Sequence, residues 1–211
     1  LGLVLNFREY PILKDTSVLN PSWVTTGIYA LLSDEILKTQ SKGILTDADL
    51  SRVLDPKRYP QKRYSYLTKL MAAFQLGFPL PGCEPKQFLI PGLLPKEEPN
   101  EITLDGDTLE FQYHYSILPE SIISRFIVLM HRDIYKQIYW RSGVMLHHSE
   151  FNEIYNIACI KADPEEKKIF IAINGKKSTR RACLMMIRIT FERIHRSFSN
   201  LQSTECVPVP D

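Results

Sequence analysis

Residues 109–115 read Leu-Glu-Phe-Gln-Tyr-His-Tyr, and this stretch decides the fold class. Its large apolar side chains alternate strictly with polar ones, which is the period of a β-strand with one buried face. Three further strands are predicted, at residues 139–147, 154–162 and 168–174. The turn Asp163-Pro164-Glu165-Glu166 joins the last two as a hairpin, so the sheet is predicted to be antiparallel.

Two helices accompany this predicted sheet. Pro119 opens one that is expected to run to Ile138, with isoleucines along one side. The other begins near Ser178 and runs to about Leu201. An antiparallel sheet plus two helices is an α+β arrangement, and residues 109–201 are predicted to form such a C-terminal subdomain.

The residues before the sheet have a mostly helical pattern. Helices are predicted at residues 21–38, at residues 47–54 and around Tyr66 to Phe74, with short strands at residues 43–46 and 88–90. This order of elements is that of a winged helix, so residues 1–95 are predicted to be a helical, winged-helix-like N-terminal subdomain. Residues 96–108 are predicted to be a linker and residues 202–211 a C-terminal linker.

The composition is that of an ordinary globular chain. It has 211 residues, of which 44% are hydrophobic and 24% charged, with 26 basic and 24 acidic residues. No apolar run approaches the ~18 residues of a membrane span. The near balance of charge argues against nucleic-acid binding, although residues 52–69 and 176–196 are locally basic. Four scattered cysteines without a CxxC pair predict no disulfide framework and favour a reducing, cytoplasmic location.

No group of residues has the pattern of a catalytic centre, so no catalytic, cofactor-binding or metal-ligating residues are predicted. Residues 174–179 follow a strand and open a helix, the setting of a phosphate-binding loop. That loop needs a glycine where this chain has Phe170, and a serine or threonine where it has Lys177. His147 and His148 are adjacent on a strand and point to opposite faces, which disfavours a shared metal ion.

The last predicted helix is apolar on two sides. One side is expected to pack on the sheet, because its residues follow three- and four-residue spacing: Leu184, Ile187, Phe191, Ile194, Phe198 and Leu201. Met185, Met186 and Ile189 lie on the reverse side and need a cover of their own. Two covers remain open, the helix that begins at Pro119 and a second subunit.

Short motifs along the chain resemble a known family. They are residues 19–29 (Leu-Asn-Pro-Ser-Trp-Val-Thr-Thr-Gly-Ile-Tyr), Gly43-Ile44-Leu45, Phe88-Leu89-Ile90-Pro91, Leu118-Pro119 and Trp140-Arg141-Ser142-Gly143. Each is weak alone, but the ordered set spans nearly the whole chain. In this set the chain resembles the COR domain of Roco proteins, the region C-terminal to their Roc GTPase.

The resemblance implies a different role for each of the two subdomains. The first, mostly helical one would pack on the Roc GTPase, and the second, α+β one would hold two protomers together as a homodimer. The fragment itself would be non-catalytic and would couple dimer state to the GTPase cycle of a longer protein, which carries a kinase in some members. No cofactor is implied for this segment, since the GTP-binding motifs belong to the Roc domain.

Specific interface residues are expected on each subdomain. Tyr64 and Phe88 are the expected GTPase-facing anchors, because aromatic side chains bury much area with few rotamers to freeze. Phe88 is equally compatible with the core of its subdomain. Met185, Met186 and Ile189 are the expected dimer contacts. The alternative function is a winged-helix nucleic-acid-binding protein with an appended dimerisation domain, whose third helix would enter the major groove.

Overall fold

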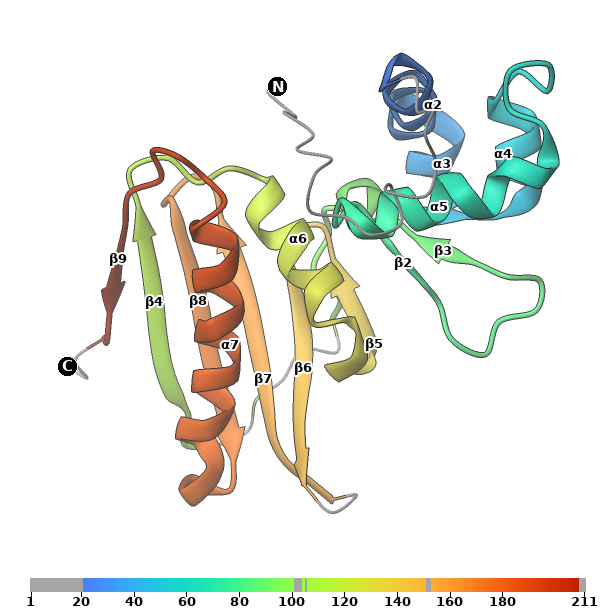
Figure 1. Cartoon of the computed structure of the whole chain (residues 1–211). Coiled ribbons are helices and arrows are strands. Elements are labelled where there is room, and N and C mark those ends of the chain that lie inside the picture. Colours follow the sequence, from blue (N-terminus) through green and yellow to red (C-terminus); the bar gives the residue numbers. More distant parts are fainter. Residues whose placement is uncertain (1–20, 101–103, 105, 151–152, 209–211) are drawn as a thin grey trace. The chain divides into compact units, whose positions relative to one another are not determined.

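The structure, a computed structural model, describes residues 21–100, 104, 106–150 and 153–208. The chain divides into two compact units, Leu1–Leu89 and Ile90–Asp211 (Figure 1). Helices and antiparallel strands occur in both. This confirms the α+β class predicted from the sequence.

The first unit combines four α-helices with a small sheet in its described part. Its elements are α2 (Pro21–Ser33), α3 (Glu35–Thr39), β1 (Ile44–Leu45), α4 (Asp47–Val53), η2 (Gln61–Arg63), α5 (Tyr64–Ala73), β2 (Phe78–Pro79) and β3 (Phe88–Leu89). The helix predicted for residues 21–38 is two helices, because Asp34 ends the first and caps the second by accepting the N–H of Leu37 at 2.8 Å. The three strands pair antiparallel in the order β1-β3-β2.

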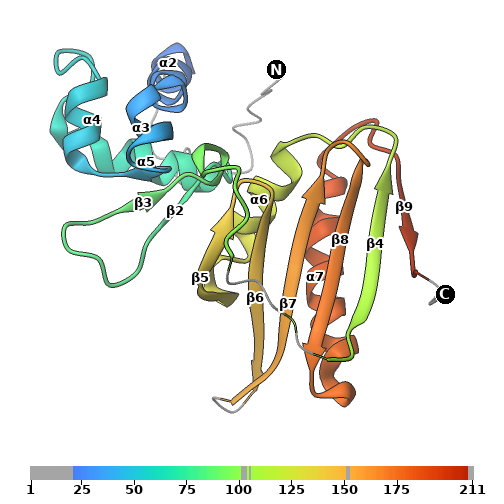
Figure 2. The same cartoon turned by 180° about the vertical axis from the view of Figure 1, so that it is seen from behind.

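The second unit is built on a six-stranded antiparallel sheet of order β5-β6-β7-β8-β4-β9. Its elements are η3 (Pro91–Leu93), β4 (Leu109–Tyr115), α6 (Ser121–Leu129), η4 (His131–Asp133), β5 (Ile134–Trp140), β6 (Gly143–Glu150), β7 (Glu153–Asp163), β8 (Lys168–Gly175), η5 (Lys177–Thr179), α7 (Arg180–His195) and β9 (Ser203–Cys206). Helices α6 and α7 cover one face of the sheet, and the view from behind shows the opposite face without them (Figures 1 and 2).

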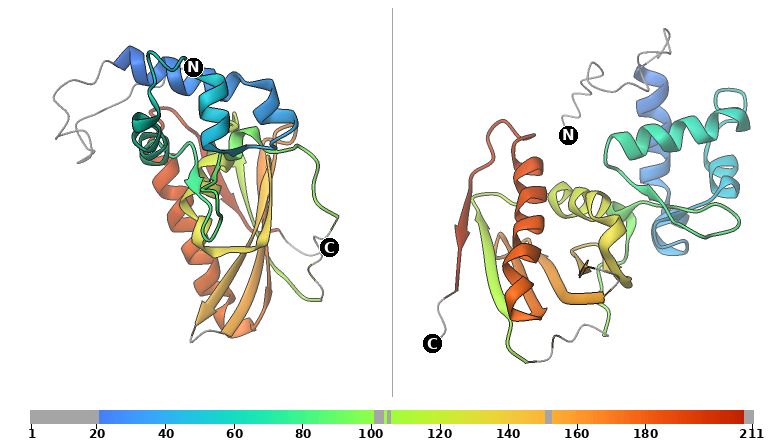
Figure 3. Two further views of the ribbon diagram at one scale, coloured as in Figure 1. Left: turned by 90° about the vertical axis from the view of Figure 1, so that its right-hand side faces the viewer. Right: turned by 60° about the horizontal axis from the view of Figure 1, so that its bottom comes forward.

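The core of the second unit lies between this sheet and its two helices. Alternate residues of each central strand are buried, as in β8, where Ile169, Ile171 and Ile173 have at most 1% of their surface exposed. Helix α7 runs along the sheet (Figure 3) and inserts Phe191 into the core, where its ring stacks on Phe126 of α6 at 4.2 Å. The two helices therefore share one continuous apolar layer with the sheet.

Strand β5 differs from the prediction. Helix α6 ends at Leu129, and residues 134–138 belong to β5 (Ile134–Trp140) where the continuation of a helix was expected. The strand expected at residues 139–147 covers the end of β5, the turn and the first part of β6. Lys136 and Gln137 have φ angles of 48° and 56°, and the β5–β6 register shifts between Ile134 and Tyr139. The irregularity spans the four-residue spacing of Ile134 and Ile138, which a helix would also produce.

The predicted C-terminal linker at residues 202–211 is wrong for part of its length. Ser203–Cys206 form β9, an edge strand whose partner is β4. Three of its four residues are exposed and most are polar, as is common for an edge strand that faces water. The apolar alternation that marks a half-buried strand is therefore missing from it.

A segment on the N-terminal side of β4, residues Ile90–Glu98, is fastened to the second unit and is called the strap below. The backbone N–H of Arg141 donates to the carbonyl of Pro95 at 2.8 Å, and its Nε donates to the carbonyl of Leu94 at 2.9 Å. Lys161 forms an ion pair with Glu98. The compact units meet between Leu89 and Ile90, so the end of the N-terminal subdomain predicted at residues 1–95 falls within the strap.

Candidate functional site

The strand-to-helix turn after β8 is a structural junction. Gly175 has a φ of +95°, and a Cβ there would collide with the carbonyl of Tyr155. Arg180 donates to the Gly175 carbonyl from Nε at 3.1 Å and Nη2 at 2.9 Å. The amide of Asn156, which is 1% exposed, donates to two further carbonyls of the turn and accepts from Thr179 at 2.6 Å. The polar groups of the turn are therefore used within the fold.

The described residues offer little for chemistry. His147 pairs with Ile157 and His148 with Asn156 across β6 and β7, so their side chains alternate between the two faces. No group of three or more potential metal ligands occurs in the part of the chain that the structure describes. Burial raises the pKa of the Cys159 thiol to about 11 and that of Cys183 to about 12, so both are protonated and poor nucleophiles at neutral pH.

Both residues expected to anchor the GTPase are buried. Tyr64 is 5% exposed and its hydroxyl donates to Ser51 at 3.2 Å. Phe88 is 6% exposed and lies opposite Leu45 in the small sheet. Tyr64 belongs to the inward face of α5 with Leu67, and Phe88 belongs to the central strand. Both side chains therefore belong to the core of the first unit, which is the alternative left open for Phe88.

The reverse side of α7 is open to solvent. Met185 is 50% exposed and Ile189, four residues further along the helix, is 58% exposed, while Met186 is half-buried. Helix α6 packs against the side of α7 that carries Phe191, so it is not the cover for this pair. Met185 and Ile189 are one turn apart and form an exposed apolar strip, called the α7 face below.

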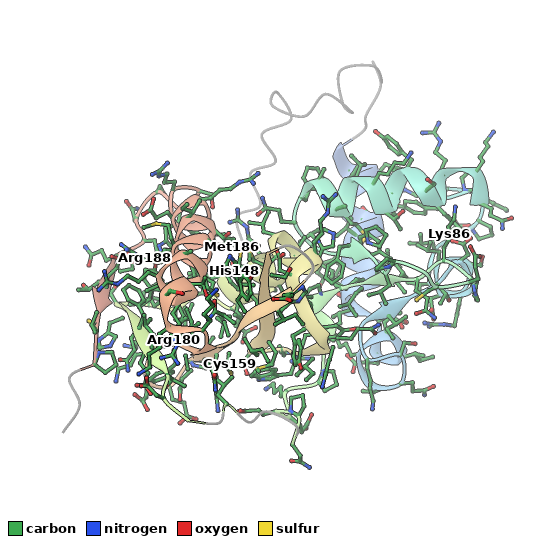
Figure 4. The ribbon with its side chains drawn as sticks, turned by 90° about the horizontal axis from the view of Figure 1, so that it is seen from below. Lys86, His148, Cys159, Arg180, Met186 and Arg188 are labelled. Carbon is green, nitrogen blue, oxygen red and sulfur yellow. The ribbon has the colours of Figure 1, made fainter. Side chains whose placement is uncertain are left out.

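A groove of about 330 Å³ lies beside the α7 face. It runs between α7 and the start of β4, and its lining residues are Leu109, Glu110, Phe111, Arg181, Leu184, Met185, Arg188 and Val207. The guanidinium of Arg188 lies 5.3 Å from the centre of the Phe111 ring and bonds to Glu205 of β9. Figure 4 shows Arg188 and Met186 on opposite sides of α7.

Ionic and hydrogen bonds hold the surroundings of the α7 face in place. Glu205 accepts from Arg188 and also from the hydroxyl of Tyr113 at 3.2 Å. The hydrogen bond to Glu205 raises the pKa of Arg188, and burial raises the pKa of Tyr113. Because β9 is tied to α7 through Glu205, helix, groove and edge strand form one ordered surface. Such a surface suits binding better than chemistry.

Comparison with protein families also finds two parts in the chain. Residues 1–94 match the family described as "C-terminal of Roc, COR-A domain", and residues 106–211 match "C-terminal of Roc, COR-B domain". The chain belongs to the COR family. This confirms the resemblance to the COR domain of Roco proteins that the motifs indicate. The α7 face and the groove lie in the COR-B part, while Tyr64 and Phe88 lie in the COR-A part.

Known proteins similar to this COR chain are much longer. It is 24% identical over 205 residues to a Roc-COR-CHAT protease from an unknown prokaryotic organism, covering 95% of this chain and 18% of that protein. It is 26% identical over 179 residues to a Roc-COR-CHAT protease of Runella zeae, covering 84% and 18%. It is 25% identical over 166 residues to the probable serine/threonine-protein kinase pats1 of Dictyostelium discoideum, covering 71% and 5%.

The COR chain therefore spans less than a fifth of the length of these relatives. The names of two of these relatives contain both Roc and COR. The family descriptions place the COR domains C-terminal to Roc. In the described residues, none of the helices has the length and apolar character needed to cross a membrane.

Proposed function

We propose that this chain is a non-catalytic regulatory and homodimerisation module, which follows a Roc GTPase domain in the same polypeptide and couples dimer state to the GTPase cycle. Two GTPase domains joined through it would be held at a high effective concentration. Nucleotide state and association would then influence each other reciprocally. Membership of the COR family supports the link to Roc.

The exposed α7 face is the observation that supports the proposed dimer. Met185 and Ile189 are 50% and 58% exposed, so burying the rest of each at an interface is worth about half of the roughly 1.5–3 kcal/mol for a whole side chain. The adjoining groove adds a concave surface, to which the aromatic ring of Phe111 and the stem of Arg188 contribute. Two-fold dimers use the same patch on both protomers, so the exposed strip of each protomer would lie against the groove of the other.

We further propose that the first unit is a winged-helix-like module that faces the GTPase. Its strand order β1-β3-β2, with α4 and α5 between β1 and β2, supports this description. Tyr64 and Phe88 would then support the GTPase-facing surface from beneath, since both are buried. None of the three relatives is named as a nucleic-acid-binding protein, so the nucleic-acid alternative has no independent support.

Sedimentation velocity over a range of concentrations tests the dimer. The chain is expected to sediment as a dimer, and both Met185→Glu and Ile189→Glu are expected to sediment as folded monomers, because a charge is costly in an apolar interface but not at a solvent-exposed position. Ile154→Glu is the matched control, since Ile154 is 53% exposed on β7 of the same unit. It should leave the dimer unchanged.

Circular dichroism separates loss of the dimer from loss of the fold. The melting curves of the variants should show intact secondary structure at the temperature of sedimentation. A wild-type chain that stays monomeric at hundreds of micromolar, or a control that dissociates as readily as Ile189→Glu, would contradict the proposed interface.

A further inference from the structure

The first unit contains a long stretch of sequence that has basic residues but no acidic ones. Between Asp55 and Glu84 there is no acidic residue, but there are five basic ones: Lys57, Arg58, Lys62, Arg63 and Lys69. The nearby Arg52 is different, because it bonds to Asp34 and Asp49 at 2.9 and 3.2 Å. In the described part of the chain, none of the five cations forms an ion pair with a carboxylate.

Two of these cations, Arg58 and Arg63, lie over a pair of aromatic rings, and two more adjoin them in the sequence. The rings of Trp23 and Tyr59 are 4.8 Å apart. The guanidinium of Arg63 lies 5.9 Å from the centre of the Trp23 ring, and that of Arg58 lies 5.7 Å from the centre of the Tyr59 ring. Lys57 and Lys62 precede these two arginines directly in the sequence. Lys57, Arg58, Lys62 and Arg63 are called the cation cluster below.

The aromatic pair holds the arginines of this cluster in position. Trp23 donates from Nε1 to the carbonyl of Arg58 at 2.8 Å, and Tyr59 donates to the carbonyl of Trp23 at 2.7 Å. A guanidinium that stacks on a fixed ring loses less side-chain entropy when it binds an anion. The positive charges of the cluster are thus not neutralised by carboxylates of the described residues, and its two arginine side chains are already held in position before a partner binds.

We propose that the cation cluster is a docking site for a short, carboxylate-rich protein segment. Charge complementarity indicates an acidic partner, because planar guanidinium groups bind carboxylates with two parallel hydrogen bonds. Lys57 and Lys62 add exposed charges beside the two arginines. This site lies on the first unit and does not depend on the α7 face or on the proposed dimer.

The size and composition of the cluster favour an acidic peptide over a nucleic acid or a membrane. Helix α5 contains a single cation, Lys69, whereas a helix that follows a phosphate backbone carries basic residues along its length. Tyr59 is buried and Trp23 is only half-exposed, so the cluster lacks the protruding apolar side chains of a membrane-inserting surface. Two arginines over one ring pair, with an exposed lysine next to each in the sequence, match a few carboxylates.

Fluorescence anisotropy of the whole chain with a fluorescein-labelled oligoglutamate peptide tests the proposal. The wild-type chain is expected to bind the peptide at low salt and to lose affinity as salt is added. Lys57→Glu/Lys62→Glu reverses two charges without touching either arginine stack, and its affinity should fall by about tenfold or more. Lys42→Glu/Lys86→Glu makes the same change in net charge elsewhere in the unit, and its affinity should change by less than about twofold. Figure 4 shows Lys86 on the β2–β3 loop.

Arg63→Lys probes the stacked geometry, since it keeps the charge and removes the planar group. It should bind the peptide more weakly than the wild type does, with an unchanged melting curve. No measurable binding by the wild-type chain, an equal loss of affinity in the Lys42/Lys86 control, or tighter binding to duplex DNA or to vesicles rich in phosphatidylserine than to oligoglutamate would each overturn the proposal.

Discussion

At the scale of single residues, the motif Trp140-Arg141-Ser142-Gly143 has a physical explanation. Trp140 and Gly143 face each other where β5 turns into β6, and Trp140 is 1% exposed. A Cβ on Gly143 would collide with the indole ring and lie 2.6 Å from the carbonyl of Ile160. The glycine is therefore required by the close approach of a large ring and a neighbouring strand.

Gly143→Ala is accordingly expected to destabilise the second unit. Overpacking of this kind costs about 1–3 kcal/mol in the free energy of unfolding. Gly92→Ala is the matched control, because a Cβ there meets no atom within 4 Å, and its effect should be close to zero. Urea unfolding of both variants measures the difference, and equal midpoints would show that the ring of Trp140 adapts without cost.

His195, on the last turn of α7, makes the stability of the second unit depend on pH. Its Nε2 lies 2.9 Å from the hydroxyl of Tyr115, and burial lowers its pKa despite the opposing influence of Glu192 and Glu205. The unfolded chain, with a histidine pKa near 6.5, therefore binds this proton more readily than the folded chain does. The contribution of His195 to the free energy of unfolding is fully present above about pH 6.5 and is lost as the pH decreases toward the folded-state pKa.

His195→Phe should remove this contribution. Urea unfolding of both proteins between about pH 7.5 and pH 5 is expected to show that the wild type loses stability relative to the variant as the pH falls, by up to about 1.4 kcal/mol for each pH unit between the two pKa values. A constant difference across that range would mean that His195 titrates alike in the folded and unfolded chain.

At the scale of elements, sequence periodicity predicted the strands and helices whose faces differ in polarity. Strand β4 and helix α7 are of this kind, since both alternate between a buried core side and a solvated side. Strand β5 was missed because its irregularity separates Ile134 and Ile138 by four residues, as a helix would. Strand β9 was missed because an exposed edge strand carries no apolar alternation.

The candidate site was predictable only in part, for a related reason. Met185 and Ile189 lie on a helix whose other side has the apolar spacing of a core face, so helical spacing predicts that they face away from that core. The interface prediction for Tyr64 and Phe88 rests on their aromatic character, which is as common in cores as at interfaces. Glu205, which ties β9 to the α7 face, is 17 residues from Arg188 and no local pattern indicated the pair.

The strap is the element whose attachment depends most on one side chain. Arg141→Ala removes the bond from Nε to the Leu94 carbonyl but keeps the backbone bond to Pro95. A lost hydrogen bond of this type costs about 1 kcal/mol, so hydrogen exchange at the amides of Leu93 and Leu94 should become about fivefold faster. Lys96→Ala, on a neighbouring exposed residue, should leave these rates unchanged; equal acceleration in both variants would contradict a fastening role for Arg141.

At the scale of the whole molecule, the structure and the family boundaries divide the chain at different places. The COR-B match begins at residue 106, whereas the second compact unit begins at Ile90 and includes the strap. Leu93 and Leu94 are buried, η3 contacts α6, and Glu98 pairs with Lys161. The strap therefore belongs physically to the sheet that follows it, although the sequence pattern of its second half is that of a linker.

Two fragments that differ only in the strap test this assignment. Residues 90–211 should fold alone and unfold at nearly the temperature at which the second unit unfolds within the whole chain. Residues 106–211 lose the buried leucines, each worth roughly 1.5–3 kcal/mol, as well as the bonds to Arg141, so they should unfold at a clearly lower temperature. If the α7 face forms the dimer, residues 90–211 should also sediment as a dimer, while residues 1–89 should remain monomeric at the same concentration. Equal melting temperatures for the two fragments would show that the strap contributes nothing to the sheet. A dimeric 1–89 fragment would instead move the self-association surface to the first unit, where Met185→Glu could not affect it.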